Sequence, residues 1–446
     1  MNKIQQAKLQ SPSALPGPKA RALIERDRAV VSPSYVRDYP FVMDRGRGAE
    51  VWDVDGNRFV DFASGIAVCS TGHSHPEVVA AIKSAAERFL HISCDYWHAG
   101  QVELAEAMAA LDPVKGPALS FFANSGTEAV EAALKLARQV SGRGRYIGFL
   151  GAFHGRTMGS LAVTASKTTQ QRGYFPAMPG VVHVPYPNPY RPLFAGDDQG
   201  RAVISYIEQL FERNLPASEV AAVIIEPIQG EGGYIVPPPG FLAALRALCD
   251  RHGIYLIFDE VQAGIGRTGR MFAWQHEGVR PDILALAKGL GSGLPIGMMV
   301  AAKQIMGKWP PGSHANTFGG NPICCAAALA TLRLVSGGYA DHARDMGERA
   351  LQRLRQFAQE FPVIGEVRGR GLMIGMEFVT DRASKAPAKE FATRLVNRAF
   401  ENGLLLLECG ASGMRIIPPL MIEARILDEG LDILYRSFKQ LIAERG

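Results

Sequence analysis

The chain has 446 residues, of which 47% are hydrophobic and 20% are charged, and its formal net charge is +5. This length predicts two or three domains with enough core for a stable enzyme, and the composition is that of a globular protein. The small net charge and the absence of a Lys/Arg block argue against nucleic-acid binding.

Cysteine usage and hydropathy do not indicate a metal-binding, secreted or membrane protein. The six cysteines lack CxxC and Cys/His ligand spacings, so we expect buried free thiols and no metal site. No apolar run approaches the roughly 20 residues of a membrane span, and the polar N-terminus lacks the apolar region of a signal peptide. We therefore expect a cytoplasmic protein without a membrane partner.

The N-terminal part is predicted to combine an arm with a hairpin. Residues 1–35 are rich in Pro, Ser, Lys and Arg, and we expect an arm that is stable only when it lies on another surface. Residues 41–65 alternate as strands do on both sides of Asp55-Gly56, which is typical of a hairpin turn.

Strand-like runs alternate with helical patterns between residues 76 and 340. This alternation predicts an α/β fold, with a mainly parallel sheet covered by helices. The predicted strands include 118–122, 146–150, 220–225, 254–258 and 296–301. We therefore assign residues 76–340 to a large domain.

The last hundred or so residues change in character and predict a smaller α+β domain. Helix-like stretches at 349–360 and 388–402 alternate with strand-like stretches at 371–378 and 414–417, before a final helix. The N-terminal hairpin could share this sheet. The small domain would then combine residues 341–446 with part of residues 1–75.

The most informative stretch contains Asp259 and Lys288. Asp259 ends the apolar run 254–258, and a carboxylate at the end of a buried parallel strand lies where α/β sheets bind ligands. Lys288 stands in Ala-Leu-Ala-Lys-Gly, where few neighbours can solvate its charge, so a lowered pKa and reactivity towards a carbonyl are expected. Pyridoxal phosphate requires such a pair: an Asp for its pyridinium nitrogen and a Lys that forms an imine.

Ser125, Gly126 and Thr127 follow a predicted strand and open a predicted helix. Ser125 followed by Glu128 matches a capping box. Free N–H groups and the helix dipole at this position attract a phosphate, and Gly126 lets it approach closely. The alternative interpretation is a well-capped helix without a ligand.

Two residues after the 146–150 strand are candidates for ligand contacts. Phe153 could stack on a flat ring or belong to the core, and Arg156 could grip a carboxylate or form a surface ion pair. We interpret His154, which lies between them, as a hydrogen-bonded turn residue without a role in proton transfer.

Glu226 and Glu231 lie five residues apart in a Gly-rich loop. They could form a metal or acid/base pair, or they could be counter-ions for arginines; the second is preferred because no His or third carboxylate lies nearby. Arg415 is an isolated charge in an apolar run, either paired or facing a substrate. The loop around Thr317 could bind a ligand or partner chain, or be a plain turn. We expect residues 186–202 to form a surface or interface loop.

Together these motifs resemble those of the class III aminotransferases, the ornithine/4-aminobutyrate subgroup of the fold type I pyridoxal-phosphate enzymes, and are most similar to the 4-aminobutyrate type. The resemblance runs in order from about Tyr39 to Pro419. Its motifs are Asn-Ser-Gly-Thr-Glu-Ala (124–129), Phe-His-Gly-Arg-Thr (153–157), Glu-Pro-Ile-Gln-Gly-Glu-Gly-Gly (226–233), Asp-Glu-Val-Gln (259–262) and Ala-Lys-Gly-Leu (287–290).

The resemblance implies pyridoxal 5′-phosphate as the cofactor. Lys288 would bond to it and move a proton between substrate and cofactor, and Asp259 would pair with the pyridinium nitrogen. Gln262 would bond the ring's 3′-oxygen, and Val261 and Phe153 would sandwich the ring. The phosphate would be held by Ser125, Gly126 and Thr127, and by Thr317 of a neighbouring subunit. A homodimer or a dimer of dimers with the active site at its interface is therefore implied.

The resemblance also implies a substrate site. Arg415 would bind the α-carboxylate of 2-oxoglutarate or glutamate, and Glu231 would act as a gate that pairs with Arg415 when an ω-amine occupies the site. Arg156 would grip the distal carboxylate of 4-aminobutyrate or glutamate. Ile66 falls where the 4-aminobutyrate enzymes have an isoleucine in the substrate pocket.

Several functions remain compatible with these motifs. The leading hypothesis is ping-pong transamination between 4-aminobutyrate and 2-oxoglutarate. Acetylornithine or ornithine aminotransferases use a similar motif set. The stretch 309–318 resembles a branch that also includes amino-acid racemases, and a non-enzymatic relative is hard to reconcile with an intact Lys288 and Asp259. The amino donor, the number of subunits and the role of Glu226 stay open.

Overall fold

The N-terminal segment contains a helix where an arm was expected. The computed structural model describes residues 15–444, so the first 14 residues of the predicted arm lie outside it. Helix α1 spans Pro18–Val30 and has Pro at its start. The Asp55 carboxylate accepts hydrogen bonds from the backbone N–H groups of Lys19 and Ala20, both at 2.9 Å. The proline composition therefore marked the beginning of a helix, whose cap comes from a distant residue.

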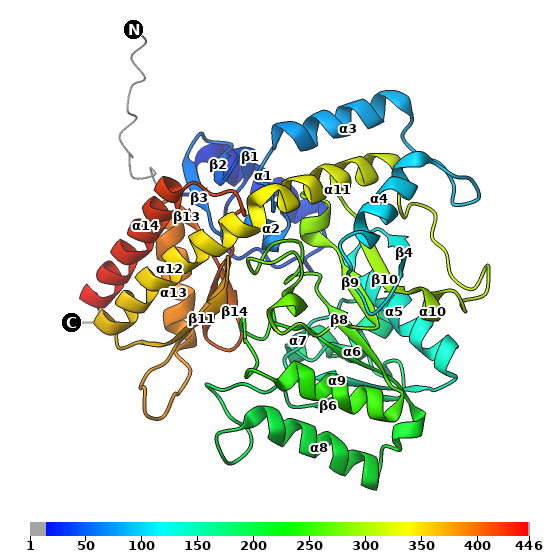
Figure 1. The fold of residues 1–446 in the computed structure, drawn as a ribbon. Helices are drawn as coiled ribbons and strands as arrows, with labels where there is room; N and C mark the ends of the chain where they lie inside the picture. The colour runs from blue at the N-terminus through cyan, green and yellow to red at the C-terminus, as the bar shows by residue number, and fades with distance from the viewer. Residues whose placement is uncertain (1–14, 445–446) are drawn as a thin grey trace.

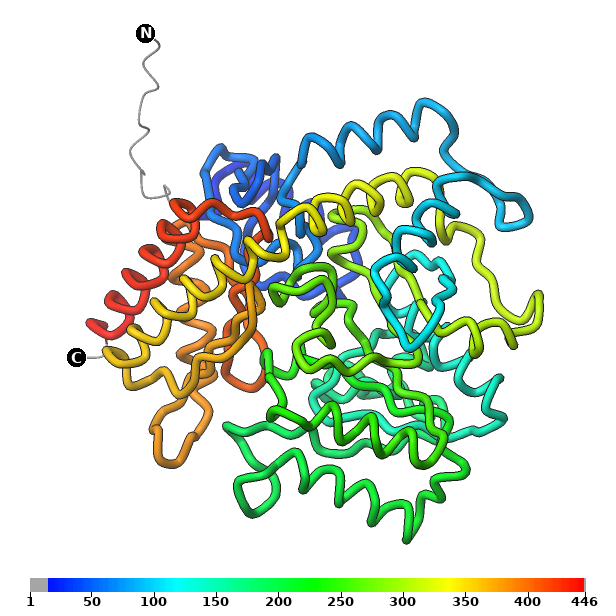
Figure 2. The backbone as a smooth tube through the Cα atoms, in the orientation of Figure 1, coloured from blue at the N-terminus to red at the C-terminus, as the bar shows by residue number. Residues whose placement is uncertain are grey.

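The predicted hairpin is confirmed, and it joins the two ends of the chain. Strands β1 (Met43–Arg47), β2 (Glu50–Asp53) and β3 (Arg58–Asp61) pair in order, and Gly56 in the turn has φ +94°. Strand β13 (Leu404–Leu405) pairs in parallel with β3. Figure 2 accordingly has the blue N-terminal segment beside the orange and red C-terminal one.

A second four-stranded sheet, in the order β11-β12-β15-β14, forms separately from the hairpin. Its strands are β11 (Ile364–Arg370), β12 (Met373–Phe378), β14 (Leu407–Cys409) and β15 (Gly413–Ile416). Strand-like stretches 371–378 and 414–417 were predicted, but their sheet does not include the hairpin, which pairs with β13 instead. The predicted domain boundary at 340/341 lies inside a helical stretch that continues from 322 to 360, and the division into domains stays a prediction.

The centre of the molecule is a seven-stranded sheet in the order β4-β10-β9-β8-β7-β5-β6. Strand β10 runs antiparallel to β4 and β9, and the remaining neighbours run parallel, which confirms the expected mainly parallel sheet. Its strands are β4 (Ala118–Ala123), β5 (Arg145–Phe149), β6 (Val181–Val184), β7 (Val220–Ile225), β8 (Tyr255–Asp259), β9 (Ile283–Leu286) and β10 (Gly297–Ala302).

Helices cover the seven-stranded sheet and the β11-β12-β15-β14 sheet (Figure 1). Helix α5 packs against β7, β9 and β10, helix α11 packs against α3 and α4, and α12, α13 and α14 lie together beside the second sheet. The helices are α2 (Ser64–Ala67), α3 (Pro76–Arg88), α4 (Ala99–Ala109), α5 (Gly126–Ser141), α6 (Met158–Val163), α7 (Thr168–Gln171), α8 (Gln199–Arg213), α9 (Phe241–His252), α10 (Lys303–Met306), α11 (Pro322–Leu334), α12 (Ala340–Glu360), α13 (Lys389–Glu401) and α14 (Ala424–Ala443).

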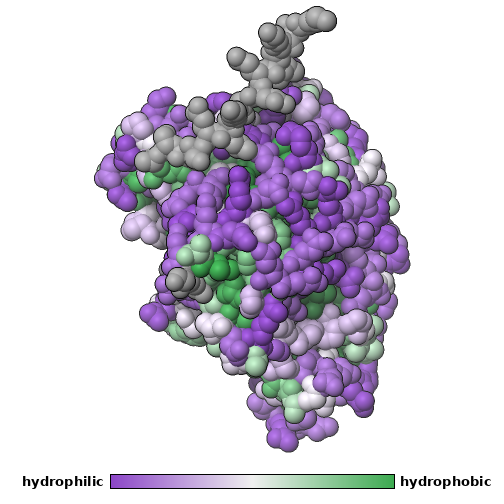
Figure 3. Space-filling view, turned by 90° about the vertical axis from the view of Figure 1, so that its left-hand side faces the viewer, coloured by the Kyte–Doolittle hydropathy of each residue, from purple (hydrophilic) through white to green (hydrophobic). Residues whose placement is uncertain are grey.

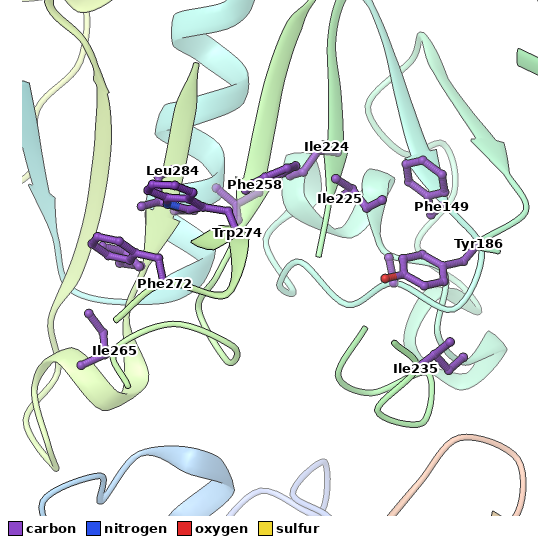
Figure 4. Packing of buried hydrophobic residues seen from close by; sticks show 14 of the residues in the cluster. Phe149, Tyr186, Ile224, Ile225, Ile235, Phe258, Ile265, Phe272, Trp274 and Leu284 are labelled. Carbon is purple, nitrogen blue, oxygen red and sulfur yellow. The ribbon is translucent and has the colours of Figure 1, made fainter. Parts of the chain in front are cut away.

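The core lies around the central strands. All residues of β7, β9 and β10 are buried, as expected for inner strands of a sheet that is covered on both faces. Phe258 of β8 and Ile224 and Ile225 of β7 pack near Phe149 and Tyr186 (Figure 4). This apolar layer fixes the strand ends, where the candidate site residues lie.

One helical stretch within residues 15–444, Pro322–Glu360, is long and apolar enough to cross a membrane by length and composition. Because α11 packs against α3 and α4, this stretch has the surroundings of a core helix. The expected cytoplasmic location stays a prediction.

The cysteines are free, and Cys249, Cys324, Cys325 and Cys409 are buried as expected. Cys69 is half-buried and Cys94 is exposed, so the expectation of burial is wrong for Cys94. This residue lies in the loop between α3 and α4 rather than in an element of the core.

Candidate active site

Asp259 and Lys288 meet at one edge of the central sheet. Asp259 is the last residue of β8, and Lys288 follows the neighbouring parallel strand β9 after one intervening residue. Burial lowers the pKa of the Lys288 amine, although Glu231 opposes this. The amine is therefore more readily deprotonated than an exposed lysine, as its sequence context predicted.

A cavity of about 510 Å³ opens beside these two residues. Its lining brings together nine of the expected site residues: Ser125, Gly126, Thr127, Phe153, Arg156, Asp259, Val261, Gln262 and Lys288. Among the described residues, the lining does not include four others that the resemblance implied, namely Ile66, Glu231, Thr317 and Arg415.

The start of helix α5 forms one wall of the cavity. Ser125 Oγ accepts a hydrogen bond from the backbone N–H of Glu128 at 3.3 Å, as a capping box requires. The Glu128 carboxylate, however, accepts from the backbone N–H of Asn124 at 2.8 Å rather than from that of Ser125. A Cβ on Gly126 would lie 2.8 Å from Cγ1 of Val261, so a larger residue does not fit there. The helix start remains open to an anion.

The donor set and shape of this cavity fit pyridoxal phosphate. The absence of a side chain at Gly126 lets Val261 pack against the helix start, and both residues line the cavity. A buried carboxylate stands at Asp259, and a desolvated amine stands at Lys288. The phosphate binds favourably at the positive end of a helix, while a carboxylate and an amine are the groups that its ring nitrogen and aldehyde require.

His154 supports Asp259, a contact that the sequence interpretation missed. The buried His154 Nδ1 donates a hydrogen bond to Oδ2 of Asp259 at 2.7 Å, and Val261 N–H donates to Oδ1 at 3.0 Å. Nε2 of His154 has no partner among residues 15–444. The positions of the two residues in the sequence could have indicated that they lie near each other. His154 follows strand β5 and Asp259 ends strand β8, so both lie at the same edge of the sheet.

Glu226 is held by backbone amides, so its interpretation as a counter-ion for an arginine is wrong. Its carboxylate accepts hydrogen bonds from the N–H groups of Phe153 at 3.0 Å and Gly230 at 2.8 Å. Burial raises the pKa of Glu226 to about 7, although His154 opposes this. The carboxylate orients the two loops that border the cavity.

Replacing Glu226 should flatten the pH dependence of stability. Between pH 4.5 and 7 the folded protein binds more protons at this group than the unfolded chain does, so the free energy of unfolding falls as pH rises. At about 1.4 kcal/mol per pH unit, the resulting loss in the free energy of unfolding is on the order of 3 kcal/mol, and it is complete above pH 7. Glu226→Gln should remove most of this loss in denaturant unfolding of the cofactor-free protein at pH 5 and pH 8.

A matched control is Glu208→Gln, which removes a surface carboxylate paired with Arg251. Its pH profile should follow that of the unmodified protein. An unchanged loss of stability in Glu226→Gln would mean that Glu226 ionises normally in the folded protein.

Glu231 and Arg415 form a buried ion pair across two parts of the fold. Glu231 lies in the loop after β7, Arg415 lies in β15, and their side chains are 15% and 7% exposed. Although burial opposes its charge, Arg415 and then Lys288 hold the pKa of Glu231 below its usual value. Counter-ion pairing, expected for this carboxylate, is therefore confirmed for Glu231.

Gln262 is oriented by a tyrosine that the sequence interpretation missed. Tyr234 Oη donates a hydrogen bond to Oε1 of Gln262 at 2.5 Å, which leaves the amide nitrogen of Gln262 free to donate. Tyr234 lies in a Gly-rich loop 28 residues earlier, and no sequence pattern links the two residues.

Three expected substrate or interface residues are exposed. Ile66 is 41% exposed and has left-handed backbone with φ +66°, and Thr317 is exposed in the loop before α11. Arg156 is exposed at the cavity and lies over the Phe153 ring, with its Cζ atom 5.7 Å from the ring centroid. These side chains are available to a ligand or to another subunit.

The Aminotransferase class-III family model matches residues 31–438. The chain is 38% identical to the alanine/serine racemase of Pyrococcus horikoshii, with 96% of this chain and 92% of that protein covered. It is 42% identical to the acetylornithine aminotransferase of Methanopyrus kandleri, with coverages of 88% and 93%. It is 39% identical to the 4-aminobutyrate aminotransferase of Mycobacterium bovis, with coverages of 94% and 96%.

Solved structures match over the same length. An amine transaminase from an uncultivated Pseudomonas species, in its pyridoxal-phosphate-bound form, superposes with a TM-score of 0.85 at 31% identity and covers 92% of this chain and 98% of its own. The match extends over nearly the whole length of both chains.

Proposed function

Because the chain belongs to the class III aminotransferase family, and so has the fold type I architecture and uses pyridoxal phosphate, we propose that it transaminates an ω-amino acid. The preferred reaction converts 4-aminobutyrate and 2-oxoglutarate to succinate semialdehyde and glutamate by a ping-pong cycle. The observation that carries this proposal is the buried pair of Glu231 and Arg415 near Lys288.

The residues around the cavity would have different roles in such a reaction. Bound pyridoxal phosphate supplies an electron sink for cleavage of the C–H bond next to the amino group. Asp259, oriented by His154 and the Val261 N–H, would balance positive charge at the ring nitrogen. Lys288 Nζ would hold the cofactor and carry the proton from one carbon to the other, which its lowered pKa favours.

Glu231 and Arg415 would let one pocket accept two kinds of substrate. An ω-amine has no carboxylate next to its reacting carbon, and an unpaired Arg415 would then be costly because it is buried. Glu231 neutralises it. When glutamate or 2-oxoglutarate binds, its α-carboxylate would displace Glu231, and the same guanidinium serves both half-reactions.

Arg156 would bind the distal carboxylate, since it lies exposed at the cavity beside Phe153. Arg156→Ala should therefore raise KM for 4-aminobutyrate by roughly 10- to 100-fold, because a charge-assisted contact is lost. For a neutral amine such as 1-aminobutane, KM should change less than about threefold. Steady-state kinetics with both amines test this, and equal losses would refute the role in carboxylate binding.

A racemase is the second candidate, favoured by similarity to the alanine/serine racemase. It would use the same lysine, the same aspartate and the same phosphate-binding residues, but it would return the proton to the original carbon from the opposite face. Formation of glutamate from 2-oxoglutarate in the presence of 4-aminobutyrate supports the first candidate. Loss of optical purity of L-alanine without any oxo acid would support the second. Acetylornithine or ornithine as the amino donor remains within the first reaction class.

We also propose that the active unit contains at least two copies of this chain. Exposed large apolar side chains gather on segments around a second cavity of about 800 Å³: Leu90, Tyr96, Trp97, Val102, Leu119 and Phe318. The face formed by α12, α13 and α14 is instead mainly hydrophilic (Figure 3). Exposed Thr317 adjoins the apolar set, as a residue that reaches a partner's phosphate should.

Light scattering of the purified protein should give the mass of a dimer or a tetramer. Trp97→Asp should shift it towards the monomer, because an added charge in an apolar interface is poorly solvated. A monomer in the unmodified protein would contradict the proposal.

A further inference from the structure

The loop that carries Glu231 is held from the second sheet by Arg368. Arg368 lies in β11 and donates hydrogen bonds from Nε and Nη2 to the carbonyl oxygen of Gly233, at 2.9 and 2.7 Å. The backbone N–H of Gly410 donates to the carbonyl of Glu231 itself at 2.9 Å. Two contacts from the C-terminal part of the chain therefore hold the loop that follows strand β7 of the central sheet.

The backbone of this loop is also packed tightly. A Cβ on Gly375 would lie 3.0 Å from the carbonyl oxygen of Gly233, and a Cβ on Gly410 would lie 2.9 Å from that of Gly232. The loop is closed by backbone hydrogen bonds between Gln229 and Ile235 at 3.0 and 3.1 Å. The backbone of the loop is therefore confined on these sides. For Glu231 to leave Arg415, its side chain would rotate while the backbone stays in place.

Two glutamates form ion pairs with Arg368 and balance its charge. Its Nη1 contacts Glu377 at 2.7 Å and also Glu366, and the side chains of Arg368 and Glu377 are 10% and 7% exposed. Arg191, in the loop between β6 and α8, pairs with the same Glu377. One buried carboxylate thus connects the 186–202 segment with the loop that carries Glu231.

We propose that Arg368, held by Glu377, is a positioning residue that keeps Glu231 against Arg415 and thereby sets the preference for amines without an α-carboxylate. This inference rests on the proposed function of Glu231 and Arg415. Without Arg368, the carbonyl of Gly233 loses its two charge-assisted donors and the loop can shift. Glu231 then pairs less well with Arg415, which matters for an ω-amine but not for glutamate, because glutamate supplies its own carboxylate.

The kinetic test compares kcat/KM for 4-aminobutyrate and for glutamate. Arg368→Ala should lower the value for 4-aminobutyrate by about tenfold or more and the value for glutamate by less than about threefold. Arg368→Lys, which keeps the charge but not the paired donation, should lie between. In a Glu231→Ala background, Arg368→Ala should leave the substrate ratio unchanged, because the two residues act through one contact.

Hydrogen exchange of the cofactor-loaded protein tests the anchor without any activity. Peptides covering 229–236 should exchange about tenfold faster in Arg368→Ala, because the loop amides depend on this contact. The control is Arg349→Ala, which removes an arginine paired with Asp428 on the surface between α12 and α14. It should leave both the exchange and the substrate ratio unchanged.

The outcomes separate the inference from the function on which it rests. If Glu231→Ala leaves the substrate ratio unchanged, the proposed gate fails, while the exchange experiment still tests the anchor. If Glu231→Ala changes the ratio but Arg368→Ala does not, the positioning role of Arg368 is overturned, whether or not exchange becomes faster. Should Arg368→Ala fail to fold, Glu377→Gln removes the buried counter-ion and should produce the same direction of change in both experiments.

Discussion

Lys288→Ala is expected to abolish turnover, with a loss of at least about 10⁴-fold, the upper range for removal of one group that transfers a proton. Lys288 is the one lysine that lines the cavity among the described residues, so no other amine there can take its place. The variant should also lose the visible absorbance of lysine-bound cofactor. Absorbance spectra and a steady-state assay of the purified variant measure both effects.

The Lys288→Ala protein should be no less stable than the unmodified protein, because burial of the Lys288 amine disfavours its charged form. The thermal midpoint of the cofactor-free variant should match or exceed that of the unmodified protein. Lys303→Ala, at the start of α10 and away from the cavity lining, is the control and should remain coloured and active. A coloured, active Lys288→Ala protein would contradict the assignment.

Glu231→Ala should cost the enzyme most of its activity on 4-aminobutyrate. The substitution leaves Arg415 buried without a counter-ion, and breaking a buried pair in this way costs about 3–5 kcal/mol. At about 1.4 kcal/mol per factor of ten, kcat/KM for 4-aminobutyrate should fall by roughly 100- to 4000-fold. For glutamate it should change less than about threefold, because its α-carboxylate replaces the lost charge.

Arg415→Ala should produce the opposite selectivity, since the α-carboxylate of glutamate then has no partner. Glutamate should lose more than about 100-fold in kcat/KM and 4-aminobutyrate less. Initial rates with both donors for the two variants form the comparison. Equal losses for both donors in both variants would mean that the pair is structural and does not select substrates.

The sheet could be predicted largely because its strands are apolar runs bounded by polar residues. Burial on both faces forces this pattern, and β7, β8 and β10 follow it. Strands β6 and β9 have only four residues each, too short for a periodic signal. Residues 1–35 were interpreted as an arm from their Pro, Ser, Lys and Arg content. The side chain that accepts hydrogen bonds from the first turn of α1 belongs to Asp55, which is distant in sequence.

The candidate site could be predicted where one motif contributes both the residue and its surroundings. Ser125, Gly126 and Thr127 fall at the helix start, and Asp259 falls at the strand end. Contacts between segments that are distant in sequence could not be predicted in this way. The hydrogen bond from His154 to Asp259 spans 105 residues, and that from Arg368 to Gly233 spans 135. No periodicity or spacing in one sequence encodes such pairings.

The proposal of ω-amino-acid transamination is tested most directly by a single half-reaction. The cofactor-loaded protein would be mixed with 4-aminobutyrate without any oxo acid, and the absorbance spectrum recorded alongside L-alanine, L-leucine, ornithine and acetylornithine. We expect 4-aminobutyrate to convert the lysine-bound cofactor to its amine form, and 2-oxoglutarate to restore the original band. An unchanged band with 4-aminobutyrate, together with loss of optical purity of an α-amino acid, would contradict it and identify racemisation as the reaction.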